Sequence, residues 1–159
     1  QKNKKFDEVF YPLGKISDTR NFAKKRKIVQ VQFSLPIKNE NKIEYLIDLL
    51  VEEQTPILCS VKRLTHNESN INFSFVQDGW TFAVDFPYET FNKKTIRKFY
   101  RELTKQEGKI YLAKDISLNE EEFKSMYPNY KDWSMIVEEV DPDKKFQSEM
   151  SLRLGLKKW

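Results

Sequence analysis

The sequence predicts an α+β fold of the ferredoxin-like type, in which a split βαβ unit forms an antiparallel sheet with its helices on one face. Two observations predict this fold. Four segments alternate apolar and polar residues and two others carry apolar residues at helical spacing, in the order strand, helix, strand, strand, helix, strand. The chain has 159 residues, 39% of them hydrophobic, which is enough for one domain with a substantial core.

The first strand is expected in residues 28–37, because apolar and polar side chains alternate there until Pro36. Its apolar face carries Val29, Val31, Phe33 and Leu35. The first helix is expected in residues 41–53, where apolar residues recur at i, i+3, i+4 and i+7. Asn39 or Asn41 is the expected N-cap.

The second and third strands are expected in residues 56–64 and 80–86, separated by a polar loop and a short extended stretch. In the later strand the apolar face carries Trp80, Phe82, Val84 and Phe86. Pro87 ends this strand, since proline cannot donate to the ladder.

A second amphipathic helix is expected in residues 93–106, with Gly108 as its left-handed stop. A fourth strand is then expected in residues 108–115, where Ile110 and Leu112 share one face. Lys114 would leave the sheet at the end of this strand, in a position from which a cation can reach a ligand.

Three further helices are expected near the C-terminus, covering one edge of the sheet. The first spans residues 118–127 with an asparagine cap and an acidic first turn, and the second spans residues 132–140. The third is expected to follow Pro142, a residue that suits a first helical turn.

The sheet face away from the helices is expected to be polar. It presents Gln30, Gln32, Ser34, Lys62, Thr81, Ala83, Asp85 and Tyr111. One interpretation is an ordinary solvated face, which antiparallel sheets tolerate. The other is a ligand-binding wall, with hydrogen-bonding groups held on stiff strands.

Composition excludes several classes of site. Cys59 is the only cysteine and His66 the only histidine, so a disulfide, a histidine-based metal cluster and a Ser-His-Asp triad lack their parts; we expect no metal site. The net charge of +4 comes from dispersed basic residues, which does not indicate a nucleic-acid footprint. The sequence shows no apolar run of membrane-spanning length and no signal peptide, so we expect a cytoplasmic location without a transmembrane segment.

Several short segments recur together in one known family. They are Phe10-Tyr11-Pro12-Leu13, Gln30-Val31-Gln32-Phe33-Ser34-Leu35-Pro36, Gly79-Trp80 with Val84-Asp85-Phe86-Pro87, Tyr111-Leu112-Ala113-Lys114-Asp115, Met126-Tyr127-Pro128, Trp133, Val140-Asp141-Pro142, Phe146 and Met150. In this order they resemble the C-terminal, substrate-side part of FAD-linked oxidases of the vanillyl-alcohol oxidase superfamily. In that family an N-terminal domain binds FAD and the C-terminal domain closes the substrate pocket.

The resemblance implies an irregular segment over residues 1–27 and a substrate, or cap, domain over residues 28–159, as a fragment of a longer flavoenzyme. Its partners would be its own N-terminal FAD-binding domain, a sugar-like substrate and, in some relatives, a reductase. Lys114 would be catalytic and, with Tyr111, would contact the flavin. Substrate-binding residues would be Gln30, Gln32, Lys62, Thr81 and Ala83. Thr81 and Ala83 depart from the nearest relatives, which carry asparagine and cysteine there, so pocket specificity is expected to differ.

The family resemblance predicts an oxidoreductase that transfers a hydride from a sugar hydroxyl to flavin, with the fragment alone inactive. The alternative is a stand-alone ferredoxin-like binding module, above all an RNA-binding one, because that fold shares the same element order. Such a module carries stacking aromatic rings on its exposed sheet face. Tyr111 is the one ring that the alternation puts there.

Overall fold

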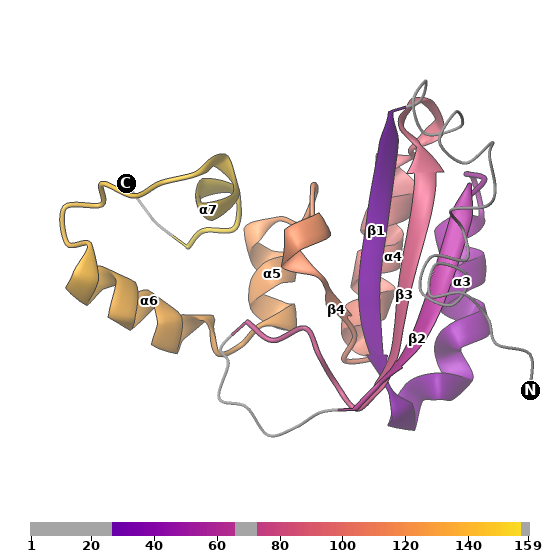
Figure 1. The fold of residues 1–159 in the computed structure, drawn as a ribbon, viewed down its shortest axis with the longest axis horizontal. Helices are drawn as coiled ribbons and strands as arrows, with labels where there is room; N and C mark the ends of the chain where they lie inside the picture. Colours follow the sequence, from indigo (N-terminus) through magenta and orange to yellow (C-terminus); the bar gives the residue numbers. More distant parts are fainter. Residues whose placement is uncertain (1–26, 66–72, 157–159) are drawn as a thin grey trace, which may run out of the picture.

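The computed structural model describes residues 27–65 and 73–156. Within them, four antiparallel strands lie in the order β2-β3-β1-β4, the ferredoxin-like arrangement that the sequence predicts. The strands are β1 (Ile28–Pro36), β2 (Leu58–Leu64), β3 (Gly79–Pro87) and β4 (Lys109–Ile110). Helices α3 (Ile43–Val51) and α4 (Lys93–Lys105) lie side by side behind the sheet (Figure 1).

The core lies between this sheet and these two helices, on the sheet face predicted to be apolar. Phe33 of β1 stacks on Phe82 of β3 with ring centroids 5.0 Å apart, and meets Phe99 of α4 edge-on at 5.0 Å. The buried cluster also contains Val31, Leu35, Leu46, Leu50, Val84, Phe86, Ile96, Tyr100, Leu103 and Ile110. The alternation of β1 and β3 therefore predicted the buried face correctly.

The start of the first helix differs from the prediction. A 3-10 helix, η2 (Ile37–Lys42), precedes α3. Neither Asn39 nor Asn41 is the N-cap of η2 or of α3. Asn39 instead donates from Nδ2 to the carbonyl of Gln106, at 2.8 Å. Asn39 therefore links η2 to the turn after α4, a long-range contact that a local capping pattern does not reveal.

The turn between α4 and β4 also differs from the prediction. The left-handed residue is Glu107, with φ 56°, whereas Gly108 does not have a positive φ. Gly108 is required for space, because a Cβ there would lie 2.2 Å from Leu103 Cδ1 and 2.9 Å from the Ser34 carbonyl oxygen. The glycine thus permits close packing of the turn against α4 and β1.

The fourth strand is much shorter than residues 108–115. β4 has two residues, and the chain then turns into a 3-10 helix, η4 (Leu112–Lys114). Lys114 consequently sits at the end of this turn. Another 3-10 turn, η3 (Tyr88–Thr90), follows β3.

The C-terminal part begins with α5 (Glu120–Met126), which Asn119 caps as expected, in a capping box with Glu122. Phe123, Met126 and Tyr127 join the buried cluster, so α5 extends the core beyond β4. Helix α6 (Tyr130–Val140) buries none of its residues fully. The last helix, α7 (Glu149–Arg153), starts after the Ser148 cap, so the prediction of a helix beginning at Pro142 is wrong.

Three features of the sequence analysis fall outside the described residues: the segment 1–26, the apolar group Phe10–Leu13 within it, and His66. Across the described part of the chain, no helix combines the length and the apolar character needed to cross a membrane.

Candidate functional site

The sheet face opposite the helices is organised in cross-strand rows, because β1, β3 and β2 pair residue by residue. One row joins Gln30, Asp85 and Leu58, and the next joins Gln32, Ala83 and Ser60. A third row joins Ser34, Thr81 and Lys62. The predicted substrate-binding residues therefore lie on one face, with Ala83 giving the smallest side chain of the middle row.

Hydrogen bonds fix the two glutamines on this face. Gln30 donates from Nε2 to Asp85 Oδ1 at 2.7 Å, and Gln32 donates from Nε2 to Thr81 Oγ1 at 3.4 Å. The Thr81 hydroxyl in turn donates to the carbonyl of Phe33 at 3.0 Å. Among the described residues, no hydrogen bond reaches either amide oxygen, so each can accept from a hydroxyl group.

One end of the face is covered, so it is neither solvated nor open to a ligand there. Ser34 and Thr81 are only 1% and 4% exposed. The Ser34 hydroxyl donates to the carbonyl of Phe75 at 2.6 Å, since the chain before β3 returns over this end of the sheet. Thr81 thus lies below the surface, where it can act on a ligand through Gln32.

Tyr111 joins this face from the edge. Its backbone N–H donates to the Gln32 carbonyl at 2.8 Å, and its ring lies against the Phe75 ring with centroids 4.7 Å apart. Two rings, rather than the one expected, therefore meet at this end. The Tyr111 side chain remains partly exposed, so one side of the ring is accessible.

Lys114 lies at the end of η4, one turn after Tyr111. Its backbone N–H donates to the Tyr111 carbonyl at 2.9 Å, and its side chain is exposed. Within residues 27–65 and 73–156 its ammonium has no hydrogen-bond or ion-pair partner. An unpaired cation at a fixed turn is suited to meeting an anionic or polarised group.

The turn carrying Lys114 is held by Asp115, whose side chain is fully buried. Asp115 Oδ1 accepts from the backbone N–H groups of Ser117 and Leu118, at 2.9 and 2.8 Å. Asp115 Oδ2 accepts from Arg153 Nη1 at 2.8 Å, which ties α7 to the turn. The alternation of the sequence does not reveal this support. An aspartate that precedes backbone N–H groups by two and three residues is a local signal for it, but Arg153 is 38 residues away.

Cys59 does not provide a reactive thiol for this site. Burial, and then the negative charge of Asp85, raise the pKa of Cys59. A raised pKa leaves less thiolate at neutral pH, and the thiolate is the nucleophile.

The family model of D-arabinono-1,4-lactone oxidase matches residues 16–154. The chain belongs to this family. The family resemblance that the sequence analysis proposed is thereby confirmed, and the matched range includes every predicted site residue.

Among curated proteins, the chain is similar to the decaprenylphosphoryl-beta-D-ribose oxidase of Mycolicibacterium smegmatis, strain ATCC 700084 / mc(2)155. The two are 27% identical over 149 residues, which is 94% of this chain and 32% of the relative. The chain thus spans about a third of the length of the relative.

Proposed function

We propose that this chain is the substrate-side domain of an FAD-dependent oxidoreductase that oxidises a hydroxyl group of a sugar or sugar-like substrate. The observation that carries the proposal is a pair of glutamines on one sheet face, whose amide oxygens accept no hydrogen bond from the described residues. Tyr111 is hydrogen-bonded to the edge of this face, and Lys114 lies in the turn that follows Tyr111. Membership of the lactone oxidase family supports it. The name of the M. smegmatis relative supports a sugar-like substrate.

The side chains on this face fit a flavin and a polyhydroxylated substrate by their chemistry. Sugar hydroxyls need acceptors and donors at fixed positions, which Gln30 and Gln32 supply from rigid strands. The flavin ring is aromatic and gains negative charge on reduction, which suits the Tyr111 ring and the Lys114 ammonium. When bound, FAD would accept the hydride.

The residues of this chain would bind, orient and stabilise charge. Gln30 and Gln32 accept hydrogen bonds from substrate hydroxyls, so that one carbon faces the flavin. Lys114 stabilises negative charge that develops as the hydride leaves and the hydroxyl loses its proton. Lys62, exposed at the edge of the face, suits a polar or anionic part of the substrate.

Ala83 has the smallest side chain of the middle row. A methyl group between Gln32 and Ser60 leaves space above the sheet that a larger residue would fill. The family resemblance implies a cysteine at this position in a related oxidase. We propose that this chain accepts a bulkier sugar at that position, since pocket contacts determine specificity.

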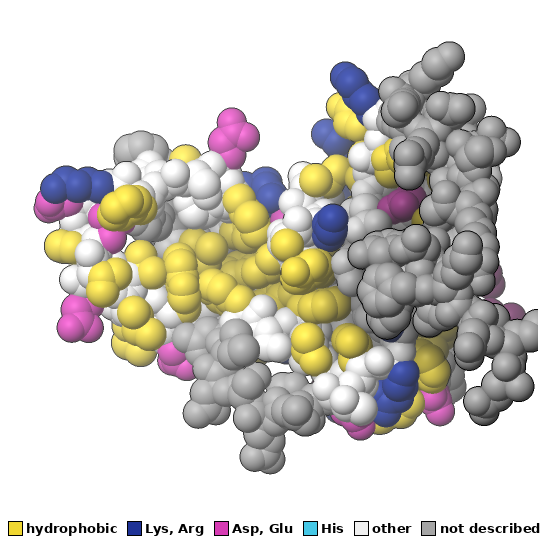
Figure 2. All heavy atoms as spheres, in the orientation of Figure 1, with side chains coloured by type: hydrophobic (Ala, Val, Ile, Leu, Met, Phe, Trp, Pro, Cys, Tyr) yellow, Lys and Arg dark blue, Asp and Glu magenta, His cyan; other side chains and the backbone are white. Residues whose placement is uncertain are grey.

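We propose that the FAD-binding domain contacts the side of the molecule that is turned toward the viewer in Figure 1. Figure 2 shows hydrophobic side chains gathered on that same side of the molecule, across its middle. Large exposed apolar residues of the C-terminal part include Met135, Ile136, Val140 and Phe146, the last 80% exposed. Such apolar surface is typical of an interface.

The 159-residue chain alone is therefore expected to self-associate. Sedimentation velocity at increasing protein concentration should show dimers or larger species, because the surface has lost its proposed partner domain. The double variant Met135→Ser/Ile136→Ser should reduce this association. A chain that stays monomeric at millimolar concentration would contradict the prediction.

Asp85→Ala is expected to raise KM for the sugar substrate and to change kcat little. Removing the carboxylate frees the Gln30 amide to rotate, so one hydrogen bond to substrate is lost or misdirected; the expected effect is about 10-fold in kcat/KM. Asp85→Asn, which still accepts from Gln30 through its carbonyl oxygen, is the control and should retain most activity. Unchanged KM in Asp85→Ala would show that Gln30 does not depend on Asp85.

The visible absorption spectrum of the full-length protein tests the function itself. It should show bound flavin that bleaches when the right sugar is added anaerobically. A panel of sugars, sugar lactones and sugar phosphates would then identify the substrate class. A colourless protein that binds single-stranded RNA in a strongly salt-dependent manner would support the RNA-binding alternative instead.

A further inference from the structure

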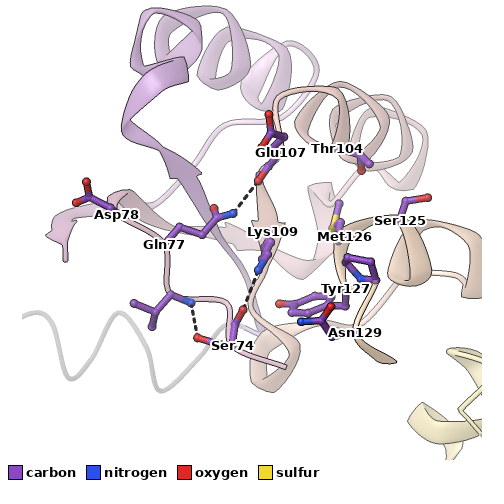
Figure 3. A pocket seen from close by; sticks show the side chains of 13 residues that line it. Ser74, Gln77, Asp78, Thr104, Glu107, Lys109, Ser125, Met126, Tyr127 and Asn129 are labelled. Carbon is purple, nitrogen blue, oxygen red and sulfur yellow. Dashed lines mark hydrogen bonds between the residues drawn. The ribbon is translucent and has the colours of Figure 1, made fainter. Parts of the chain in front are cut away.

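A pocket of about 540 Å³ lies at the edge strand β4, and none of the predicted site residues lines it. Its walls come from three segments: residues 74–78 before β3, the end of α4 with the start of β4, and the end of α5 (Figure 3). The size is within the range of small-molecule sites. Its floor and sides mix the Tyr127 ring with polar groups.

Lys109 is the cation of this pocket. It is half-buried, and its Nζ donates to the Ser74 carbonyl at 3.1 Å and lies 5.6 Å from the centroid of the Tyr127 ring (Figure 3). In the described part of the chain, no carboxylate forms an ion pair with it. Burial lowers the pKa of Lys109, because the charged form has lost water without gaining a counter-ion.

The two carboxylates in the lining already have other cations. Asp78 pairs with Arg63 at 2.8 Å, and Glu107 pairs with Lys38 at 2.6 Å. Their charges are therefore offset at the rim, although such exposed pairs are individually weak. The charge of Lys109 is the one that remains without an opposite partner among the described lining residues.

The lining also includes a second, exposed side chain that can donate hydrogen bonds. Asn129 lines the pocket just after α5, near Tyr127 (Figure 3). Among the interactions of the described residues, its side-chain amide takes part in none. A lysine ammonium and an amide N–H₂ together offer several donors to one oxyanion.

The alternative role for Lys109 is to stabilise helix ends. The C-terminal turns of α4 and α5 both reach the pocket, and their carbonyl groups carry partial negative charge that favours a cation. However, the one hydrogen bond of Lys109 within the described residues goes to Ser74, in the chain before β3, and not to a helix carbonyl. Among the described residues, no helix carbonyl accepts a hydrogen bond from the Lys109 ammonium, so its other N–H groups can donate to a ligand.

We propose that this pocket binds an oxyanion, either the carboxylate or the phosphate of a small molecule, between the Lys109 ammonium and the Asn129 amide. The Tyr127 ring and Met126 provide apolar walls for the body of that molecule. The site is separate from the sheet face proposed to meet flavin and sugar, so it stands or fails independently of the proposed function.

Competitive acetylation of the full-length protein tests this site. Trace acetic anhydride labels lysines in proportion to their free-amine fraction and access, and peptide mass spectrometry reads each lysine separately. An anion on Lys109 would keep it protonated and covered. At an anion concentration of twice the Kd, labelling of Lys109 should fall about threefold, while the exposed Lys131 should be unaffected.

Inorganic phosphate and acetate, each at matched ionic strength against sodium chloride, separate the two sources of an oxyanion. Protection by phosphate alone identifies a phosphate site, and protection by acetate identifies a carboxylate site. Asn129→Ala should weaken the protection without changing labelling of Lys131. Equal protection in Asn129→Ala, or labelling of Lys109 that neither anion slows, would overturn the proposal and leave Lys109 as a stabiliser of helix ends.

Discussion

Lys114→Ala in the full-length enzyme is expected to lower kcat by about 100-fold or more, with little change in KM. The side chain is exposed and has no partner among the described residues, so its loss should not affect the fold. Its proposed role is to stabilise negative charge that develops during hydride transfer, an interaction made mainly in the transition state. Removal of such an interaction lowers kcat and kcat/KM together.

Two measurements separate this role from a structural one. Flavin absorbance and the unfolding midpoint of Lys114→Ala should match those of the unchanged protein. Lys114→Arg should recover part of the rate, because the charge is kept but the guanidinium has a different shape. Lys131→Ala, which removes an exposed lysine on α6, is the control. If Lys114→Ala turned over as fast as this control, Lys114 would have no catalytic role.

The regular strands were predictable because each carries its own signal. In β1 and β3 the two faces differ so clearly that alternation alone gives the buried side, and a shift of one residue would expose Phe33 and Phe82. The glutamine face follows from the same alternation. The strands and the polar face can therefore be predicted from the alternation of apolar and polar residues, which is visible in a single sequence.

The turns and the supports of the site were not predictable in the same way. The covering of Ser34 and Thr81 depends on where residues 73–77 return across the sheet, which no periodicity records. The end of β4 depends on the chain turning into η4, although Gly108–Asp115 alternates like a strand. In both places tertiary contacts prevail over a local pattern.

Arg153→Met is expected to destabilise the 159-residue chain by about 3 kcal/mol, because it leaves the carboxylate of Asp115 buried without its cation. Asp115 has no exposed side-chain surface, and Arg153 is 31% exposed. The arginine also donates to the carbonyl of Leu118, so its loss leaves that oxygen with one partner fewer. Urea denaturation at low protein concentration, with an unchanged m-value, measures the effect.

Lys98→Met gives a matched control, because Lys98 forms an exposed ion pair with Glu52, with 57% and 55% of the two side chains exposed. Its loss should change stability far less than Arg153→Met does, because solvent screens exposed ion pairs. The double variant Asp115→Asn/Arg153→Met should lose much less stability than the sum of the two single changes, because it no longer buries an unpaired carboxylate.

Because Asp115 fixes the turn after Lys114, Arg153→Met should also lower kcat, whereas Lys98→Met should not. If Arg153→Met were as stable as Lys98→Met, α7 would not hold the Lys114 turn. Other contacts would then have to fix the position of Lys114.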